Sequence, residues 1–403
     1  MTAQPALSKR AQSIGLSKIA QLVSRAAELR AQGKDVISLG FGEPDFDTPL
    51  NIREAAQKAM DEGDTRYTAT GGTNTLKLAV QKKFKNDNGL DVDLDQIMVS
   101  VGAKHVLFNA FLATLDEGDE VIIPAPFWTS YPDIVKVAEG TPVFVSCGAD
   151  VGFKLTPSVL EAAITPKTKW VMINSPSNPT GTVYSADEIS ALAEVIRKHP
   201  HVWILSDDIY EHIRFTEGKY ATIAALAPDL SGRTLTMNGV SKAYAMTGWR
   251  IGFCTGPKAL IKAMTAIQGQ ATSGPNSIAQ AAAVEALEGP QDFLDESRAI
   301  FKERRDKVVG WLNECPGIKC QTPDGAFYAF PTCSDCFGKV TPDGTKIETI
   351  DDLASFLLEK HDVTIIPGTA FGAPNEFRIS YAASLEILHE ACNRIKSGCE
   401  QLQ

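Results

Sequence analysis

From about residue 97 onward, short apolar runs alternate along this chain with stretches of helical, amphipathic character. Trp170–Ile173 and Val202–Leu205 are apolar at every position, as strands are when both faces of a parallel sheet are buried. Strands that alternate with helices are typical of α/β proteins with a largely parallel sheet. The runs that we predict as strands are Ile97–Val101, Glu120–Ile123, Pro142–Val145, Trp170–Ile173, Val202–Leu205, Thr234–Met237 and Ile251–Thr255.

The two ends of the chain follow a different pattern. Residues Ile14–Ala31 predict one helix that ends before Gly33. After about residue 300, the strand-like pieces are shorter: Ala326–Phe330, Val363–Ile366 and Phe377–Tyr381. With 403 residues, the chain is too long for one simple core. We therefore predict a large domain over residues 46–299, and a smaller α+β domain built from residues 1–45 and 300–403.

Charge and composition exclude several classes of protein. A net charge of −10 argues against nucleic-acid binding, and no run of 18 apolar residues indicates a membrane span. The N-terminus lacks the apolar core of a secretory signal, so we expect a reduced, cytoplasmic protein. Cys147 and Cys254 are expected to be small core residues. Cys333 and Cys336 have no second cysteine pair and no nearby histidine, so no metal site is predicted.

A polar loop follows the strand predicted at Thr234–Met237. In open α/β sheets, ligands bind beyond the carboxyl ends of the strands, and Lys242 stands just past such an end. Ser241 beside it and Arg250 further along could hold a phosphate by charge-assisted hydrogen bonds and leave the Lys242 amine available. Taken alone, this segment fits an ordinary solvated loop lysine better.

Three further segments carry polar groups at predicted strand ends. Asp207 and Asp208 follow one strand, with Tyr210 close by, although Asp208 could equally cap a helix N-terminus. Two prolines and a glycine surround Asn178 in a rigid turn. Small residues at 102–103 would let backbone amides approach an anion, but the segment has neither a Walker nor a dinucleotide-binding pattern.

Together these segments resemble the fold-type I pyridoxal-phosphate family, class I, in its bacterial aspartate aminotransferase branch. The resemblance covers about residues 35–384, and its motifs stand in the order and spacing of the family. They are GEPDFDTP (Gly42–Pro49), YTATGG (Tyr67–Gly72), PAPFWTSYP (Pro124–Pro132), NSPSNPTG, SDDIYEH, SKAYAMTGWRIG and FRISYA (Phe377–Ala382). The resemblance implies a mostly parallel seven-stranded sheet with helices on both faces.

The resemblance also implies roles for the residues at the strand ends. Lys242 matches the lysine that forms a Schiff base with pyridoxal phosphate and moves the substrate proton; a partly buried cationic pocket would lower its pKa. Asp207 matches the acid that keeps the pyridine nitrogen protonated, so that the ring accepts electrons. Asn178 and Tyr210 match the groups that hydrogen-bond the 3-oxygen of the ring.

The phosphate site of the family has counterparts here as well. A hydroxyl, a guanidinium and three backbone amides correspond to it: Ser241, Arg250, and Gly102, Ala103 and Lys104. Tyr67 matches a phosphate ligand supplied by the neighbouring subunit, which implies a homodimer with shared active sites. Trp128 matches the aromatic residue that stacks on the cofactor ring.

The substrate site is implied in the same way. Arg378 matches the arginine that binds the α-carboxylate in a bidentate pair, against the alternative of an exposed arginine at a strand end. Lys104 matches the lysine for the distal carboxylate of bacterial aspartate aminotransferases, against the alternative of a solvent-facing lysine. Gly42, Trp128 and Asn178 complete the predicted site, and Gly42 would belong to a mobile N-terminal part that closes over substrate.

The implied reaction is a ping-pong transamination with L-aspartate, or a similar dicarboxylic amino acid, as donor. Ile14-Gly15-Leu16 replaces a Lys-Pro-Ser stretch that is common in this branch, and His105 stands where glutamine is more usual. These departures put 2-oxoglutarate and prephenate in doubt as preferred acceptors and leave a shorter one, such as glyoxylate or oxaloacetate, open.

Three alternatives remain open at this point. An aromatic, prephenate or broad-range aminotransferase would share all the cofactor residues. A pyridoxal-phosphate β-lyase or cyclase would share the scaffold without needing a 2-oxo acid. A regulatory cofactor-binding module fused to a DNA-binding domain is disfavoured by the acidic balance of the chain.

Overall fold

The computed structural model describes residues 7–15 and 18–403. Its main sheet has seven strands in the order β2-β8-β7-β6-β5-β3-β4. They are β2 (Ile97–Ser100), β3 (Glu120–Ala125), β4 (Thr141–Ser146), β5 (Thr168–Asn174), β6 (Trp203–Asp207), β7 (Thr234–Gly239) and β8 (Gly252–Thr255). Only β8 runs antiparallel to its neighbours, so the prediction of a mostly parallel seven-stranded sheet is confirmed.

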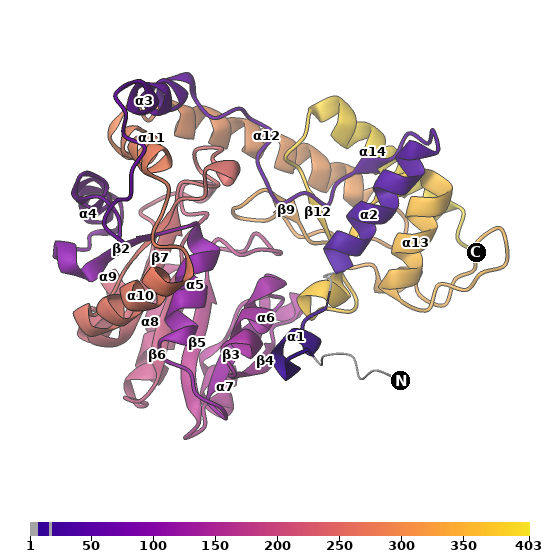
Figure 1. Cartoon of the computed structure of the whole chain (residues 1–403). Helices are drawn as coiled ribbons and strands as arrows, with labels where there is room; N and C mark the ends of the chain where they lie inside the picture. The colour runs from indigo at the N-terminus through magenta and orange to yellow at the C-terminus, as the bar shows by residue number, and fades with distance from the viewer. Residues whose placement is uncertain (1–6, 16–17) are drawn as a thin grey trace, which may run out of the picture.

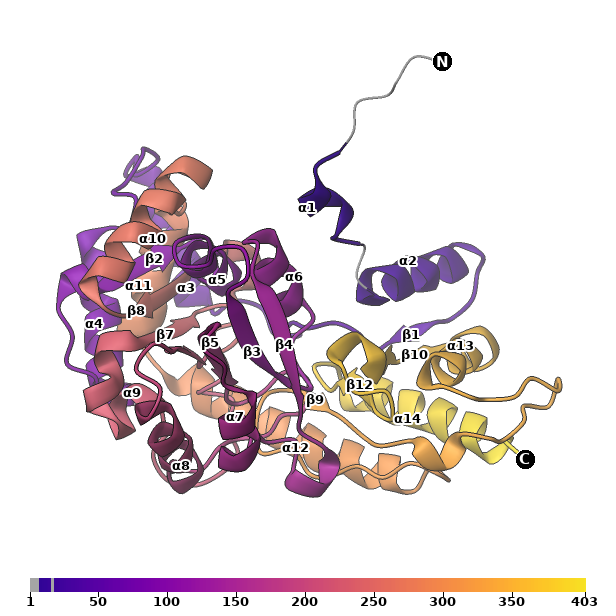
Figure 2. The ribbon, with the colours of Figure 1, turned by 90° about the horizontal axis from the view of Figure 1, so that it is seen from below.

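Helices cover both faces of this sheet (Figures 1 and 2). Successive strand residues point to opposite faces, and both sets are apolar here. Met172 packs toward α5, α6 and α10, whereas Val171 packs toward α7 and α8. A third core lies between the sheet and α4 and α11. These helices are α4 (Asn74–Asn88), α5 (Ala103–Leu112), α6 (Ser130–Val137), α7 (Pro157–Ala163), α8 (Ala186–Arg197), α10 (Lys258–Ala271) and α11 (Ser277–Glu288).

Residues from α2 (Lys18–Ala31) and β1 (Ile37–Ser38) meet the C-terminal part of the chain in a second region, drawn at the right of Figure 1. Strand β1 pairs in parallel with β10 (Val363–Thr364). A second small sheet is antiparallel, with β12 (Phe377–Ser380) between β11 (Ile366–Pro367) and β9 (Tyr328–Ala329). The helices of this region are α2, α13 (Ile350–His361) and α14 (Leu385–Glu400).

The long helix α12 (Asp292–Asn313) links the two regions (Figure 1). Its residues Phe301 and Val308 belong to the core that the C-terminal strands and helices share. Position 300 lies inside this helix, so a division there would cut through a continuous element. The domain boundaries of residues 46–299, and of 1–45 with 300–403, stay a prediction.

The prediction of one helix from Ile14 to Ala31 was wrong at its start. A short helix, α1 (Lys9–Gln12), ends at Ser13, residues 13–15 are not helical, and α2 begins at Lys18. Glycine costs about 1 kcal/mol relative to alanine inside a helix, and Gly15 stands where the predicted helix breaks. The predicted end at Ala31 is correct. Leu16 lies outside the described residues.

Two expectations about composition can be compared with the structure. Cys147 and Cys254 are buried free thiols, as predicted, and Cys333 and Cys336 are also free and buried. Over residues 7–15 and 18–403, no helix is both long enough and apolar enough to cross a membrane.

Candidate active site

Four strands deliver chemistry-bearing residues to one edge of the main sheet. β5, β6 and β7 are parallel, and β2 shares their direction because β2 and β7 are both antiparallel to β8. Asn174 and Asp207 end β5 and β6 and lie side by side in register. Lys242 follows β7, and Gly102 lies between β2 and α5. The carboxyl ends therefore meet where an open α/β sheet binds its ligands.

A cavity of about 240 Å³ lies at this edge. It brings together most of the site residues that the sequence singles out, although they come from distant parts of the chain. The lining residues are Gly42, Ala103, Lys104, Trp128, Tyr131, Asn174, Asn178, Asp207, Ile209, Tyr210, Met237, Ser241, Lys242, Arg250 and Tyr328.

The amine of Lys242 is held by a hydrogen bond, and its pKa is lowered. Nζ donates a hydrogen bond to the carbonyl oxygen of Gly42 over 2.7 Å. Burial lowers the pKa of Lys242 to about 8, because a charged amine is poorly solvated there. Glu43 opposes this shift, and the positive charges of Arg250 and Arg378 add to it.

Asp207 is a buried acid with a hydroxyl partner. The Tyr131 hydroxyl donates to its Oδ2 over 2.5 Å, and the Ile209 backbone N–H donates to Oδ1 over 3.3 Å. Burial raises the pKa of Asp207 to about 6, although the Tyr131 hydroxyl, the Ile209 amide and the charge of Lys242 lower it. At neutral pH this carboxyl is therefore mostly ionised but close to its titration range.

Asp208 has a different environment. The suggestion that it caps a helix N-terminus is wrong, since residues 209–212 form turns and no helix begins there. Its Oδ1 accepts a hydrogen bond from the Ser206 hydroxyl over 2.7 Å, and it does not line the cavity. Burial and the charge of Glu211 raise the pKa of Asp208 to about 7.

Positive charge gathers where α5 begins. Gly102 has a φ of +81°, and a Cβ at this position would lie 2.4 Å from Nη2 of Arg250, so only glycine leaves room for that guanidinium. Nζ of Lys104 lies 4.8 Å from the centre of the Trp128 ring. Burial, followed by the charge of Arg250, lowers the pKa of Lys104. Lys104 is exposed, but it also lines the cavity, so it is not the purely solvent-facing lysine of the alternative interpretation.

Arg378 is not the exposed arginine of the alternative interpretation: its residue exposure is 2%. Nη1 donates to Oδ1 of Asn178 over 2.9 Å and Nη2 to the carbonyl oxygen of Gly40 over 2.8 Å. Its Nε has no hydrogen-bond partner within the described part of the chain. The guanidinium lies 4.6 Å from the centre of the Tyr328 ring, so it contacts two residues that line the cavity.

Some residues lie elsewhere or were not anticipated. Tyr67 is 96% exposed and borders a separate surface hollow, and His105 is half-buried with Nδ1 unbonded. Tyr131, Asn174 and Tyr328 also line the cavity, although no role was predicted for them from the sequence. Asn174 could have been found from its place at the end of a predicted strand, whereas the two tyrosines gave no comparable signal.

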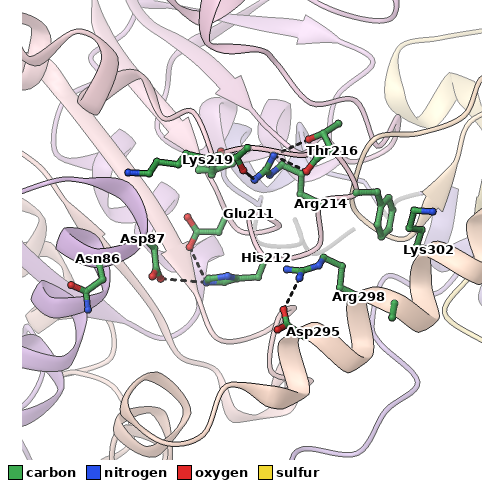
Figure 3. Close-up of a pocket in the computed structure, with 14 residues that line it drawn as sticks. Asn86, Asp87, Glu211, His212, Arg214, Thr216, Lys219, Asp295, Arg298 and Lys302 are labelled. Atoms are coloured by element: carbon green, nitrogen blue, oxygen red, sulfur yellow. Dashed lines mark hydrogen bonds and ion pairs between the residues drawn. The ribbon is translucent and has the colours of Figure 1, made fainter.

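A second cavity, of about 590 Å³, is lined in part by residues of the same loop after β6 (Figure 3). There Asp87 and Glu211 converge on the His212 ring, whose Nε2 is 3.6 Å and 3.2 Å from their carboxylates. These groups are close enough to hold a metal ion, but the Lys83 ammonium already contacts the Glu211 carboxylate. Burial alone would raise the pKa of Glu211; the charges of Lys83 and His212 outweigh it and hold that pKa well below its usual range.

Known proteins resemble this chain over nearly its whole length. Residues 34–395 match the family model of aminotransferase class I and II. An aspartate aminotransferase of Rhizobium meliloti strain 1021 is 55% identical to this chain; the match covers 99% of this chain and 97% of the relative's length. An aspartate/prephenate aminotransferase of Cereibacter sphaeroides is 55% identical over 96% of each chain.

Solved structures agree with the sequence matches. The crystal structure of the Rhizobium meliloti aspartate aminotransferase superposes with a TM-score of 0.97 at 55% identity, covering 100% of both chains. The Thermus thermophilus aspartate aminotransferase with maleate gives a TM-score of 0.91 at 40% identity, over 98% of this chain and 100% of that one.

Proposed function

Because this chain belongs to the aminotransferase class I and II family, we propose that it transfers the amino group of L-aspartate, or of a similar dicarboxylic amino acid, to a 2-oxo acid. The observation that carries the choice of substrate is a pair of cations, Lys104 lining the cavity and Arg378 beside it, in addition to the Lys242 and Arg250 that we assign to the cofactor. Arg378 contacts two of the cavity's lining residues and Lys104 borders the cavity directly. A substrate with two carboxylates would use both.

The family implies a pyridoxal-phosphate cofactor, and we propose that the cavity binds it. Its residues suit such a group: Trp128 offers an aromatic face, Asp207 a buried acid, and Arg250 a cation beside the α5 N-terminus. The space that Gly102 leaves for the Arg250 guanidinium supports a phosphate at that end. When bound, the cofactor supplies a carbonyl carbon for the amino group and a ring that accepts electrons.

Lys242 is proposed to hold the cofactor and to carry the reacting proton. With a pKa of about 8, a useful fraction of its amine is neutral near pH 7, so Nζ can take a proton from the substrate Cα and return it. The hydrogen bond to Gly42 limits where Nζ can point. Transfer by such a positioned base contributes about 10²–10⁴ in rate.

The other cavity residues are proposed to orient and polarise. The ionised Asp207, held by Tyr131, would keep a proton on the facing ring nitrogen. Asn178 and Tyr210 would hydrogen-bond the ring 3-oxygen, and Ser241 would join Arg250 and the amides of residues 102–104 at the phosphate. Tyr67, fully exposed on this chain, is proposed to reach the site of a second copy in a homodimer.

Prephenate is a second candidate amino acceptor, since the Cereibacter sphaeroides relative is an aspartate/prephenate aminotransferase. The lysine missing from residues 14–16 is the feature of this chain that stands against it. The two possibilities differ only in the acceptor, so they leave the roles of Lys242 and Arg378 unchanged.

A matrix of amino donors against 2-oxo acid acceptors, read as kcat/KM, tests the proposal. Aspartate should exceed phenylalanine and alanine as donor, and Lys104→Met should lower kcat/KM for aspartate by about 10–100-fold, because a charge-assisted hydrogen bond is lost. The same change should alter kcat/KM for phenylalanine less than about threefold. Lys58→Met, at an exposed lysine that does not line the cavity, is the matched control. Equal losses for both donors would contradict the dicarboxylate assignment.

A further inference from the structure

Tyr328 touches two proposed active-site groups that belong to different regions of the chain. Its partner in the β9–β12 pairing is Ser380, so Arg378 lies diagonally across the same face of the small sheet. The guanidinium carbon of Arg378 is 4.6 Å from the centre of the Tyr328 ring. At the other end of the same side chain, the hydroxyl is 2.9 Å from that of Tyr210.

The ring of Tyr328 helps to hold Arg378 in place. The tyrosine is fully buried and Arg378 nearly so, which removes the competition of water for the guanidinium. Nε of Arg378 has no hydrogen-bond partner among the described residues, so its position is defined by the bonds to Asn178 and Gly40 and by two aromatic rings, that of Tyr328 and that of Phe371 at 5.0 Å. A desolvated cation–π contact of this kind changes a binding constant by on the order of tenfold.

The hydroxyls of Tyr328 and Tyr210 share one hydrogen bond, in which either group can be the donor. Each phenol has one proton to donate and can accept through its oxygen. When Tyr210 donates its proton to a ligand oxygen, Tyr328 is the group placed to donate to Tyr210. Hydrogen bonds in such a chain strengthen one another, so the Tyr328 hydroxyl makes Tyr210 a better donor.

We propose that Tyr328 is a positioning residue that couples the carboxylate-binding and cofactor-binding halves of the site, its ring through Arg378 and its hydroxyl through Tyr210. The inference rests on the proposed function, because it assigns partners to both of these residues. Gly42 keeps the arrangement compact, since a Cβ there would lie 3.3 Å from the Tyr328 hydroxyl oxygen.

Two substitutions separate the ring from the hydroxyl. Tyr328→Phe removes only the hydroxyl: the pH midpoint of the cofactor absorbance should rise by about half a unit, because Tyr210 then stabilises negative charge on the ring oxygen less well. Succinate binding, measured by calorimetry, should stay within about twofold. Tyr328→Leu also removes the ring, and should weaken succinate binding on the order of tenfold.

Tyr381→Phe is the matched control, because Tyr381 is also a buried tyrosine. Its hydroxyl donates to the carbonyl oxygen of Ala326 over 3.1 Å and forms no hydrogen bond with Tyr210 or Arg378 in the described structure. This substitution should leave both the midpoint and succinate binding unchanged. An unshifted midpoint in Tyr328→Phe, or equal weakening of succinate by Phe and Leu, would overturn the inference. If Tyr328→Leu does not fold, the Tyr328→Phe midpoint decides alone.

The outcomes also separate this inference from the proposed function. A wild-type protein that fails to use aspartate, together with a shifted midpoint in Tyr328→Phe, would refute the substrate and keep the coupling. A wild-type protein that takes up no pyridoxal phosphate would refute both. An active wild type with an unshifted Tyr328→Phe midpoint would refute the coupling alone.

Discussion

Residues of the loop after β6 line two charged cavities, and the pKa values of the carboxyl groups of Asp207 and Glu211 are shifted in opposite directions. Asp207 and Tyr210 face the proposed active site, whereas Glu211 and His212 face the second cavity. At the first cavity, burial moves the pKa of Asp207 to about 6 and that of Lys242 to about 8. At the second cavity, ion pairing holds Glu211 firmly in its charged form.

This difference in pKa distinguishes residues that could take part in the reaction from residues that stabilise the fold. A group whose pKa lies near neutrality can gain and lose a proton during a reaction, and such groups cluster at active sites. A buried carboxylate locked against an ammonium exchanges no proton and instead fixes the backbone that carries it. We infer that the Lys83–Glu211 pair stabilises the folded form of the loop that carries Asp207 and Tyr210.

The largest expected effect is on turnover, from Lys242→Ala. The rate of multiple-turnover transamination should fall by about 10²–10⁴-fold or more, because the base that moves the Cα proton is removed. The thermal unfolding midpoint of the cofactor-free protein should not fall, since burial of the Lys242 amine disfavours its charge. Wild-type turnover in this variant, measured with aspartate and 2-oxoglutarate, would remove Lys242 from the mechanism.

The next effect is on stability, from Lys83→Met. This change leaves the Glu211 carboxylate buried without its ammonium, and should lower the free energy of unfolding by about 3 kcal/mol. Denaturant unfolding measures it, and kcat/KM per folded molecule should change little. Adding Glu211→Gln should restore part of the loss. A cost below about 0.5 kcal/mol would mean that the pair is not a structural anchor.

A smaller effect is the pH dependence of cofactor uptake. Combination with the cofactor needs a neutral Lys242 amine, whose fraction grows as pH rises toward the pKa of about 8. The uptake rate of the cofactor-free protein should therefore rise roughly tenfold per pH unit up to about pH 8 and then level off. Stopped-flow absorbance measures this rate, and a flat profile between pH 6.5 and 7.5 would contradict the lowered pKa.

The smallest effect is expected from Arg298→Ala at the rim of the second cavity. Arg298 pairs with Asp295 on the surface of α12, and such exposed pairs contribute about 0–1 kcal/mol to stability. Stability should change by less than about 0.5 kcal/mol, with kcat/KM within twofold. A larger loss of activity with unchanged stability would show that the second cavity takes part in function, and would break the contrast between the two cavities.

The sequence predicts the framework of the fold well because its determinants are local. The central strands β5 and β6 contain continuous apolar runs, and burial on both faces requires such runs. The start of α2 was missed because apolar spacing continues through residues 14–15 although the helix does not. Propensity and periodicity conflict at Gly15, and the backbone follows the propensity of glycine.

A site residue could be predicted from the sequence where its place follows from the topology of the sheet, and not where it depends on packing between distant segments. Asp207, Lys242 and Asn178 could be proposed because each follows a strand, and strand ends converge by topology. Tyr131 and Tyr328 could not, because their hydroxyl partners are 76 and 118 residues away and are set by the packing of helix and small sheet. Tyr67 lies apart from the cavity of this chain, so its predicted role depends on a second copy.

The central claim, that Lys242 holds the cofactor in the first cavity, has a direct test. Borohydride reduction of the protein loaded with pyridoxal phosphate makes a lysine–cofactor linkage permanent, and peptide mass spectrometry then locates it. We predict one cofactor mass on the peptide that contains Lys242, and none on the peptide that contains Lys104. Label on Lys104 or another lysine, with Lys242 unmodified, would contradict the account.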